Sequence, residues 1–522
     1  MGMLDGLKVF SGLQSLVGMG VATIRMVAAV LTVLGVWIHL DTLNYLSQQS
    51  RTDPRDYAKD GYVPRENRRP ALLQTQNIAN FVPTTVPEAI VPDVVESYQD
   101  DLPVEQGQSD GPIHRTDPNR FFIPFLSMGP NNQLEGFLES VFLAIKLNRT
   151  MCIPPFFRHK TDEALSSSIS ADLRINRKKL SEFVTFCDTE QIQEKCPKLD
   201  TVWWGSNPKT LTCGISLQKR YKTFQMLTGL ENWYSTTVCK VFEDIPTYPA
   251  DLTGKFQVRS TAAVDLVETF NDQNSGACVL WFMPFHTISN FRSAVMSHLL
   301  HKNDGGDRQL AMDIVKYVQR PEAFQNVVKK FIAEKAAGKP LISVHWRYDQ
   351  RDWLLHCDRL PDGQADKSCR NVAQMLENPE LAADNFRIFL RGVRNALKQD
   401  MIVYIAAPMD EQIMRSKLID AIKEVGLTSL SSVDLLPYLE ETGIRKSDIH
   451  DVLSTSEQEL CFQSDVFLYS QISTWSFNLV YQRRVNNKNS IDNFYVFGGQ
   501  AVAAATHQAV ENFKRTDHVI AN

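Results

Sequence analysis

The sequence predicts an α/β protein with two α/β units that face a common cleft, assigned to residues 118–335 and 336–510. Short apolar stretches of strand length alternate with longer segments whose apolar residues recur every three or four positions. The alternation occurs in two runs, one beginning near Arg120 and the other at Pro340. Because ligands of such sheets bind at the carboxyl ends of the strands, we expect the active cleft between the two units.

The composition is that of a globular chain and excludes one class of partner. Hydrophobic residues make up 43% and charged residues 22% of the 522 residues. The net charge of −5 implies no basic surface for a nucleic acid. We therefore expect no nucleic-acid partner.

The N-terminus has the pattern of a membrane anchor. Residues 21–46 are mostly apolar and could span a bilayer if Arg25 reaches back to the cytoplasmic face. Residues 1–20 would then be a cytoplasmic tail, because the basic flank precedes the apolar segment. A cleaved signal peptide and a buried helix are the alternatives. The anchor predicts a single-pass type II protein whose main part lies in the lumen of the Golgi or endoplasmic reticulum. Residues 47–117, rich in Pro, Asp, Glu and Gln, are expected to form a stem.

The first unit opens with a strand, a turn and a helix. The apolar run 121–126 predicts the strand, and residues 127–132 predict the turn. Apolar positions from Leu134 to Ile145 follow the spacing of a helix with one buried face. Later in this unit we expect strands at 151–153 and 277–282 and helices at 178–183, 261–271 and 322–336.

The second unit repeats the alternation of strands and helices. We expect strands at 341–347 and 401–406 and helices at 384–398 and 411–425. The stretch from Asp465 to Arg484 then reads as a strand at 466–469, a small polar turn and a helix. Ser473 or Thr474 is expected to be the N-cap of that helix.

The nine cysteines fit an oxidising compartment. None has the spacing of a zinc site, so disulfides are the better interpretation. An odd count leaves at least one thiol unpaired, and Cys152 is the candidate for a buried thiol. Two pairs are close enough in sequence to close small loops: Cys187 with Cys196, and Cys357 with Cys369.

The sequence lacks the motifs of several common enzyme classes. The sequence has no GxGxxG after a strand, no GxxxxGK[ST], no HExxH and no GxSxG. A DxD metal clamp for a nucleotide sugar is also missing. Any nucleotide-sugar chemistry would therefore have to neutralise the diphosphate with protein groups.

Three groups of polar residues could supply that neutralisation. Asn131 and Asn132 lie in a turn at a helix N-terminus, where amides and backbone N–H groups are available, although one of them could simply cap the helix. His345 and Arg347 project to the same side at the end of a strand, and a guanidinium can grip two phosphate oxygens. A structural ion pair of these residues with Asp349 or Asp352 is the alternative for the second group. The third group is the turn at Ser473 and Thr474.

Three segments together resemble the signature segments of the GDP-fucose protein O-fucosyltransferases. They are residues 128–155, 344–353 and 465–484, in the family's order. The likeness extends over most of residues 120–500 and is weaker between 160 and 330. The resemblance implies a GT-B architecture with two Rossmann-like domains. It also implies an inverting transfer of fucose from GDP-fucose to a Ser or Thr hydroxyl, without a metal ion or other cofactor.

The resemblance also assigns roles to residues. Asn132 matches the asparagine that contacts the donor and the reacting centre, with Asn131 beside it. Arg347, together with His345, matches the diphosphate clamp. The remaining donor contacts are Glu457 as the carboxylate for guanine and the turn of Ser473, Thr474 and Trp475 at the phosphate. Asp465 is also placed among the donor-binding residues.

The match has departures and leaves alternatives open. Pro130 and Asn131 replace the usual approach to the asparagine, and Trp475 replaces a phenylalanine. Glu135, one helical turn after Asn132, could be the general base, although a solvated glutamate on the helix face is the alternative. A fucosyltransferase that acts on a glycan and a non-catalytic Golgi membrane protein that retains the fold are the rival functions.

One N-glycosylation pattern is present. It is Asn148-Arg149-Thr150, and its use requires that this part of the chain be lumenal.

Overall fold

The structure is a computed structural model that describes residues 111–126, 129–158, 168–204, 215–230, 253–256, 276–282, 306–347, 375–376, 378–408, 411–470 and 473–520. Val104–Asn522 form one compact unit. The expected anchor at 21–46 and most of the expected stem lie outside the described residues. Within the described ranges, no helix has both the length and the apolar character of a membrane span.

Packed structure begins before Arg120. The backbone N–H of His114 donates to Phe183 O at 2.7 Å, and Thr116 Oγ1 lies 2.9 Å from Thr150 Oγ1. Residues 113–117, expected to belong to the stem, are therefore tied to the first half of the fold.

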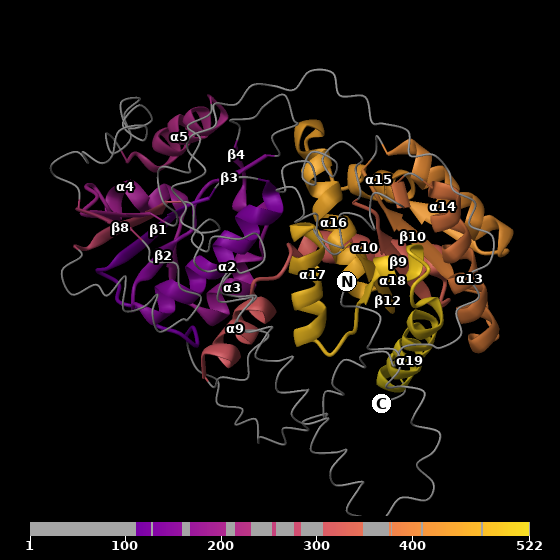
Figure 1. Ribbon diagram of the computed structural model, residues 1–522. Helices are drawn as coiled ribbons and strands as arrows, with labels where there is room; N and C mark the ends of the chain where they lie inside the picture. The colour runs from indigo at the N-terminus through magenta and orange to yellow at the C-terminus, as the bar shows by residue number, and fades with distance from the viewer. Residues whose placement is uncertain are drawn as a thin grey trace, which may run out of the picture. The chain divides into compact units, whose positions relative to one another are not determined.

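The first half, residues 111–317, is built on a six-stranded sheet (Figure 1). Its strands lie in the order β5-β2-β1-β8-β6-β7, and all neighbouring pairs are parallel. The strands are β1 (Phe121–Phe125), β2 (Thr150–Cys152), β5 (Phe186–Cys187), β6 (Thr201–Trp204), β7 (Thr253–Phe256) and β8 (Cys278–Phe282). A short antiparallel pair stands apart, β3 (Phe156–Phe157) with β4 (Ser168–Ile169).

Helices cover both faces of this sheet. Alternation along β1 sends Phe122 into one core and Phe121 and Ile123 into the other. The core of Phe122 includes α2 (Pro130–Lys146), α3 (Arg177–Phe183) and α9 (Gly306–Tyr317). The opposite core includes α4 (Ile192–Lys195) and α5 (Ile215–Thr228).

The second half, residues 322–520, has a five-stranded parallel sheet of order β11-β10-β9-β12-β13. In chain order these are the third, second, first, fourth and fifth strands, which is the order of a Rossmann fold. The strands are β9 (Leu341–His345), β10 (Ile402–Ala406), β11 (Thr428–Ser431), β12 (Val466–Tyr469) and β13 (Ile491–Asp492).

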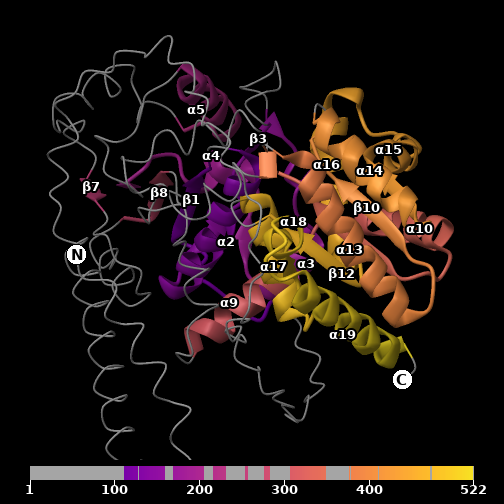
Figure 2. The same ribbon diagram turned by 45° about the vertical axis from the view of Figure 1, so that its right-hand side comes forward.

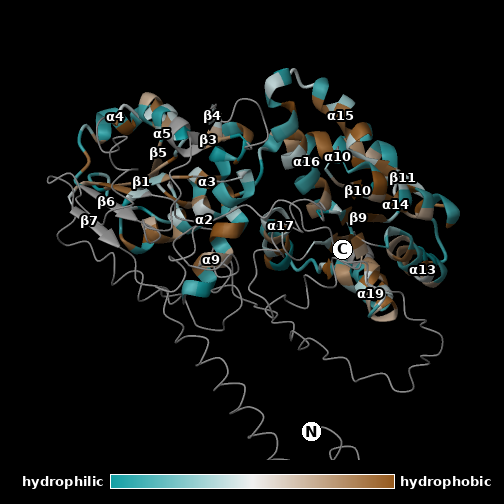
Figure 3. Cartoon of the chain, turned by 45° about the horizontal axis from the view of Figure 1, so that its top comes forward, coloured by the Kyte–Doolittle hydropathy of each residue, from teal (hydrophilic) through white to brown (hydrophobic). Residues whose placement is uncertain are grey.

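Two helical layers enclose this sheet as well. One face carries α13 (Pro379–Leu397), α14 (Gln412–Glu424) and α19 (Val502–Ile520), with the short α18 (Asn493–Phe497) beside them. The other face carries α10 (Glu322–Ala336), α15 (Ser432–Glu440) and α16 (Ile449–Gln463). Hydrophilic and hydrophobic residues alternate around helices such as α14 and α15 (Figure 3), as expected when one side of a helix packs on a sheet.

Two helices depart from the division expected from the sequence. Helix α10 was expected to end the first unit, but Phe324, Val328 and Phe331 pack in the core of the second half. Helix α17 (Thr474–Val485) contributes Trp475 and Leu479 to that core, whereas its Tyr481 and Val485 pack in the first half. Helix α17 therefore joins the two halves.

Most predicted elements are confirmed within two residues of their expected limits. The starts of two helices are exceptions. Helix α2 begins at Pro130, inside the turn predicted at 127–132, and helix α13 begins at Pro379 and not at Asp384. The side chain of Asn378 accepts a hydrogen bond from the Leu381 N–H, and a proline at the first helical position favours the start. The helix predicted at 261–271 lies outside the described residues.

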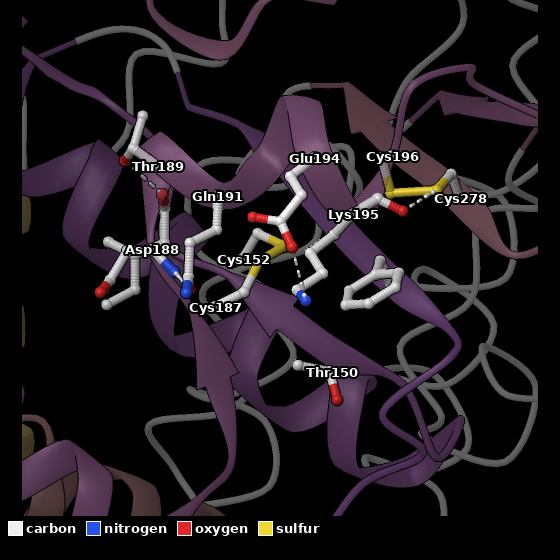
Figure 4. Close-up of a disulfide and its surroundings, with 12 residues drawn as sticks. Thr150, Cys152, Cys187, Asp188, Thr189, Gln191, Glu194, Lys195, Cys196 and Cys278 are labelled. Atoms are coloured by element: carbon white, nitrogen blue, oxygen red, sulfur yellow. Dashed lines mark hydrogen bonds and ion pairs between the residues drawn. A yellow bond between two sulfur atoms is a disulfide. The ribbon is translucent and has the colours of Figure 1, made fainter.

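The cysteine expectations need correction. Cys152 is not a free thiol, because it forms a disulfide with Cys187, and Cys196 pairs with Cys278 (Figure 4). Cys187 and Cys196 are therefore not partners of each other. The first bridge joins neighbouring strands β2 and β5, an arrangement that sequence separation does not reveal. Cys461 is a buried free thiol, and Cys357 and Cys369 lie outside the described residues.

Candidate active site

The carboxyl ends of β9 and β12 are the switch point of the five-stranded sheet. The two strands are the first and fourth in chain order, yet they lie side by side and parallel. Helix α13 follows β9 and packs on one face, whereas α17 follows β12 and packs on the other. Chains that leave in opposite directions open a crevice at the strand ends, which is where α/β sheets bind ligands.

His345 is the last residue of β9 and is 5% exposed. Its Nδ1 lies 2.7 Å from Ser476 Oγ, and its ring stacks on Trp475 with the centroids 4.0 Å apart. Burial, with the charge of Arg347 as the second cause, holds the pKa of His345 well below 6.5. His345 is therefore neutral at physiological pH and can serve as a hydrogen-bond donor or acceptor, but not as a cation.

The backbone of Arg347 is fixed by the start of the turn after β12. Ser470 Oγ donates to His345 O at 2.7 Å and accepts from the Arg347 N–H at 3.3 Å. Asn493 Nδ2 donates to the same two oxygens, His345 O at 2.9 Å and Ser470 Oγ at 3.0 Å. The predicted second and third groups are thus brought together. The alternative partners, Asp349 and Asp352, lie outside the described residues.

The turn at Ser473 has the predicted form. Ser473 is the N-cap of α17, Thr474 is its first residue, and Trp475 follows at 8% exposure. The Ser473 side chain makes no capping hydrogen bond, so its hydroxyl is available for another partner. Trp475 Nε1 donates to Ser454 Oγ of α16 at 3.0 Å, which fixes the indole plane under His345.

The first turn of α2 reaches this region through α17, which packs against α2 (Figure 1, Figure 2). Neither asparagine is the helix cap, because Gly129 is the N-cap and Pro130 the first helical residue. Asn131 Oδ1 accepts from Gln458 Nε2 at 2.9 Å, and Asn131 O accepts from Asn478 Nδ2 at 2.9 Å. Asn132 follows, half-buried, at the positive end of the helix.

Glu135 is buried, with 6% of its surface exposed, and is not the solvated helix-face residue of the alternative interpretation. Burial raises its pKa from 4.5 to about 7. In the described part of the chain, no hydrogen-bond or ion-pair partner holds the carboxylate. A carboxyl group in this state can exchange a proton near neutral pH.

Glu457 lies on the buried side of α16. Its Oε1 accepts from Tyr404 Oη at 2.9 Å and from Ser432 Oγ at 2.8 Å. Burial raises its pKa from 4.5 to about 7, despite these two hydrogen bonds. Ser432 directly follows β11, so Glu457 lies toward the carboxyl ends of the strands, on the same side of the sheet as His345.

Asp465 is not brought to this site. Its Oδ2 accepts from the Leu341 N–H at 2.8 Å, and its own N–H donates to Leu341 O at 3.0 Å. Leu341 begins β9, whereas His345 ends it, so Asp465 lies at the opposite edge of the sheet. Its carboxylate aligns β9 with β12 and does not line the switch point.

Asn148, the predicted glycosylation site, is exposed in the turn between α2 and β2. Its Oδ1 accepts from the Asp117 N–H at 3.1 Å, and its φ of 50° is in the left-handed region that asparagine tolerates. The exposed amide is compatible with a glycan.

Several contributors to the site carry no local signal in the sequence. They are Ser470, Ser476, Asn478, Gln458 and Asn493. Each is a polar residue buried inside the fold. Ser470 lies in the predicted polar turn after β12, and the other four are on helices whose polar residues at these positions face inward. Among the described side chains, no group of three or more His, Cys, Asp or Glu could hold a metal ion.

The structure is that of an α/β protein with parallel sheets, and its candidate site lies at the carboxyl edge of one of them. The sequence pattern of the GDP-fucose protein O-fucosyltransferases matches residues 122–486. The chain belongs to this family, and it is a glycosyltransferase for which the family supports GDP-fucose as donor. The resemblance noted in the sequence is thereby confirmed. No curated protein sequence matches the chain.

Solved structures of fucosyltransferases are similar at low identity. POFUT1 in complex with GDP is 14% identical with a TM-score of 0.44, over 72% of this chain and 99% of that one. POFUT1 in complex with GDP-fucose is 15% identical with a TM-score of 0.42, over 72% and 98%. Fucosyltransferase NodZ from Bradyrhizobium is 10% identical with a TM-score of 0.33, over 69% and 92%.

Proposed function

We propose that this chain transfers fucose from GDP-fucose to a Ser or Thr hydroxyl of a secretory-pathway protein, with inversion and without a metal ion. The observation that carries the proposal is the meeting of three groups in one region. His345 ends β9 and Arg347 follows two residues later, Ser473 is the N-cap of α17, and α17 packs against the helix that bears Asn132. Two parallel-sheet halves around this region support the GT-B architecture that the family resemblance implies.

The diphosphate is bound at the switch point. Arg347 supplies a permanent positive charge in a planar fork, which suits two phosphate oxygens. His345 is neutral and adds a hydrogen bond without repelling that guanidinium. The hydroxyls of Ser473 and Thr474, and the first N–H groups of α17, complete an anion site at a helix N-terminus.

Guanine is read by Glu457. The N1–H and the amino group of guanine are adjacent donors, so a carboxylate is the complementary partner. Tyr404 and Ser432 engage only Oε1 of Glu457 and hold the side chain in one rotamer. Binding of these donors favours the ionised form of a carboxyl group whose pKa burial has raised to about 7.

The transfer step takes place beside the first turn of α2. The acceptor oxygen attacks C1 of fucose, and the bond between C1 and the phosphate oxygen breaks with its electron pair leaving on GDP. Arg347 stabilises the charge that develops on the diphosphate. Asn132 contacts the donor at the reacting centre. Glu135 accepts the proton of the acceptor hydroxyl, for which a pKa of about 7 is suited.

The two disulfides support a lumenal location. Such bonds form and persist in oxidising compartments and are rare in the cytosol. We propose that residues 21–46 anchor the chain in the Golgi or endoplasmic reticulum membrane with the enzyme in the lumen. Protease protection of sealed microsomes, and removal of a glycan at Asn148 by endoglycosidase, test this topology. If protease added outside sealed microsomes digests residues 118–510, the proposed topology is wrong.

The function is tested with the full-length protein in detergent. Calorimetry with GDP should detect binding, and labelled GDP-fucose should yield fucosylated product in EDTA. The acceptors are folded EGF-like domains, folded thrombospondin-type domains and free glycans. Product formed only on glycans would favour the alternative function, a fucosyltransferase with a glycan acceptor. The anomeric configuration of the product shows whether the transfer inverts C1 of fucose. An undetectable affinity for GDP would remove the donor assignment.

A further inference from the structure

The first turn of α2 is held by side chains that belong to the other half of the fold. Gln458 of α16 donates from Nε2 to Asn131 Oδ1 at 2.9 Å and to Trp475 O at 3.0 Å. Asn478 of α17 donates from Nδ2 to Asn131 O at 2.9 Å. Both amides are buried, at 4% and 3% exposure, so water competes little for these bonds.

The chemistry of the acceptors fixes the direction of these bonds. Asn131 O and Trp475 O are backbone carbonyl oxygens, which can only accept. The amide nitrogens of Gln458 and Asn478 must therefore face them, because a flipped amide would bring two oxygens into contact. Gln458 uses both of its N–H groups in this way, so its side chain has one orientation.

The turn lacks the usual local support. Its N-cap is Gly129, which has no side chain, and Pro130 at the first helical position has no N–H. The Gln458 and Asn478 amides do not cap the turn, because they donate to oxygens and do not accept from its free N–H groups. They instead anchor Asn131, the residue next to Asn132, to α16 and α17.

Stability alone does not account for an amide at position 478. In the described part of the chain, Asn478 Oδ1 is buried without a hydrogen-bond partner. An unpaired buried oxygen destabilises the fold and offsets much of what the Nδ2 bond contributes. An asparagine at this position is better explained by its Nδ2 hydrogen bond to Asn131 O, which holds the first turn of α2 in place.

We propose that Gln458 and Asn478 are positioning residues that hold the first turn of α2, and with it Asn132 and Glu135, against the donor site. The inference rests on the proposed function, because it assigns the purpose of the turn to the transfer step. The consequence is that loss of either amide slows the transfer and leaves the donor bound.

The test compares Asn478→Leu and Gln458→Met with the wild-type full-length protein. We expect kcat to fall about ten- to hundredfold, as small misplacements of reacting groups do, with GDP affinity by calorimetry unchanged within about twofold. Thermal stability of Asn478→Leu should stay near that of the wild type. The matched controls are Asn486→Leu at the C-cap of α17 and Gln463→Met on α16. Their amides donate to Gln482 O and Glu459 Oε1, away from α2. The controls should keep wild-type kcat.

A double-mutant cycle separates positioning from general damage. If Gln458 acts through Asn131, adding Asn131→Ala to Gln458→Met should reduce kcat little further. Fully additive losses, a rise in KM at constant kcat, or wild-type kcat in both single variants would each overturn the proposal.

Hydrogen exchange over residues 129–137 gives a readout that does not require turnover. We expect faster exchange there in both variants and not in the controls. If the wild type has neither GDP binding nor transfer, the proposed function fails, while exchange still decides whether the two amides hold the turn. Unchanged exchange in both variants contradicts the positioning role whatever the activity.

Discussion

At the scale of single residues, Arg347 is expected to carry most of the diphosphate stabilisation. We predict that Arg347→Ala lowers kcat/KM by at least about 10²-fold, because charge develops on the leaving group as the bond to C1 breaks. Arg347→Lys should restore only part of the loss, since lysine keeps the charge but not the planar fork. Arg391→Ala removes an exposed arginine of α13 and is the control. Near wild-type kinetics in Arg347→Ala would assign the clamp to another residue.

Glu135 is expected to set the acidic limb of the pH profile. Its pKa is raised by burial to about 7, so the base form increases as pH rises through that value. We predict that kcat at saturating GDP-fucose, where bound guanine keeps Glu457 ionised, rises from roughly pH 6 to 8 and then levels. Glu135→Gln should lose this rise and about 10²-fold of activity or more. Glu457 has a pKa of about 7 as well, so Glu457→Gln is the control. A limb lost only in Glu457→Gln would exclude Glu135 as the base.

The same burial gives Glu135 a cost in stability that depends on pH. Between pH 4.5 and about 7 the folded state keeps a proton that the unfolded state has lost, so stability falls as pH rises through this window. The rise of the Glu135 pKa from 4.5 to about 7 corresponds to a loss of about 3 kcal/mol in the free energy of unfolding at higher pH. Glu135→Gln should therefore raise the free energy of unfolding in urea near pH 8 by up to about that amount, and change it little near pH 4. Equal effects at both pH values would contradict the buried, unpaired carboxyl group.

The residues of the donor site were within reach of sequence reasoning because their signals are local. His345 and Arg347 stand at a strand end with the right alternation, and Ser473 caps a helix. Glu135 carries no such signal, since its burial depends on what packs against α2. Asp465 was placed with the donor site because it begins a matching segment, yet it lies at the amino end of β12.

At the scale of elements, Arg483 fixes the junction between α16 and β12. It is fully buried, and its guanidinium donates to a ring of backbone carbonyl oxygens. The acceptors are those of Cys461, Phe462, Ser464, Asp465 and Asn489. The last carbonyls of a helix have no intrahelical partner, so the arginine of α17 supplies what the end of α16 lacks.

We predict that Arg483→Met lowers the free energy of unfolding by about 3 kcal/mol, because several buried acceptors lose a charged donor at once. Arg484→Met, at the next and exposed position, is the matched control and should have an effect within about 0.5 kcal/mol. Urea denaturation followed by circular dichroism measures both. If the two variants unfold alike, Arg483 does not hold the junction.

Element limits followed the sequence where caps and apolar periodicity agree and failed where they differ, whereas the disulfide pairings failed because a long-range contact decides them. Helix α13 starts early because Asn378 caps it, a local signal that the apolar periodicity alone does not include. The disulfides follow strand adjacency. Cys152 and Cys187 pair because β2 lies beside β5, and two-residue strands such as β5 are too short to recognise from periodicity.

At the scale of the whole molecule, the alternation of strands and helices was enough to predict two α/β halves. It could not assign α10, which precedes the first strand of the second sheet and packs on that sheet. It also could not show that α17 joins the two cores, because a single amphipathic pattern does not reveal two different neighbours. Contacts between residues hundreds of positions apart have no local signature.

Two buried ion pairs extend across the two halves, and a third joins the segment between the halves to the second one. Each joins an arginine that precedes α10 to a carboxylate at or near α16, and all six side chains are less than a tenth exposed. The pairs are Arg158 with Asp448, Arg174 with Asp451, and Arg320 with Glu459. A buried charge that loses its partner is strongly destabilising, whereas removal of both charges can be nearly neutral. The halves should therefore unfold together.

We predict one calorimetric transition for the folded part of the wild type. Asp451→Leu should lower the free energy of unfolding by about 3–5 kcal/mol, because Arg174 would stay buried without its carboxylate. The double variant Arg174→Met with Asp451→Leu should be more stable than Asp451→Leu alone, since no uncompensated charge remains. Lys330→Met with Glu441→Leu removes a solvent-exposed pair instead and should change stability by less than about 1 kcal/mol. Two separate transitions in the wild type, or strictly additive losses in the double variant, would mean that these pairs do not couple the halves.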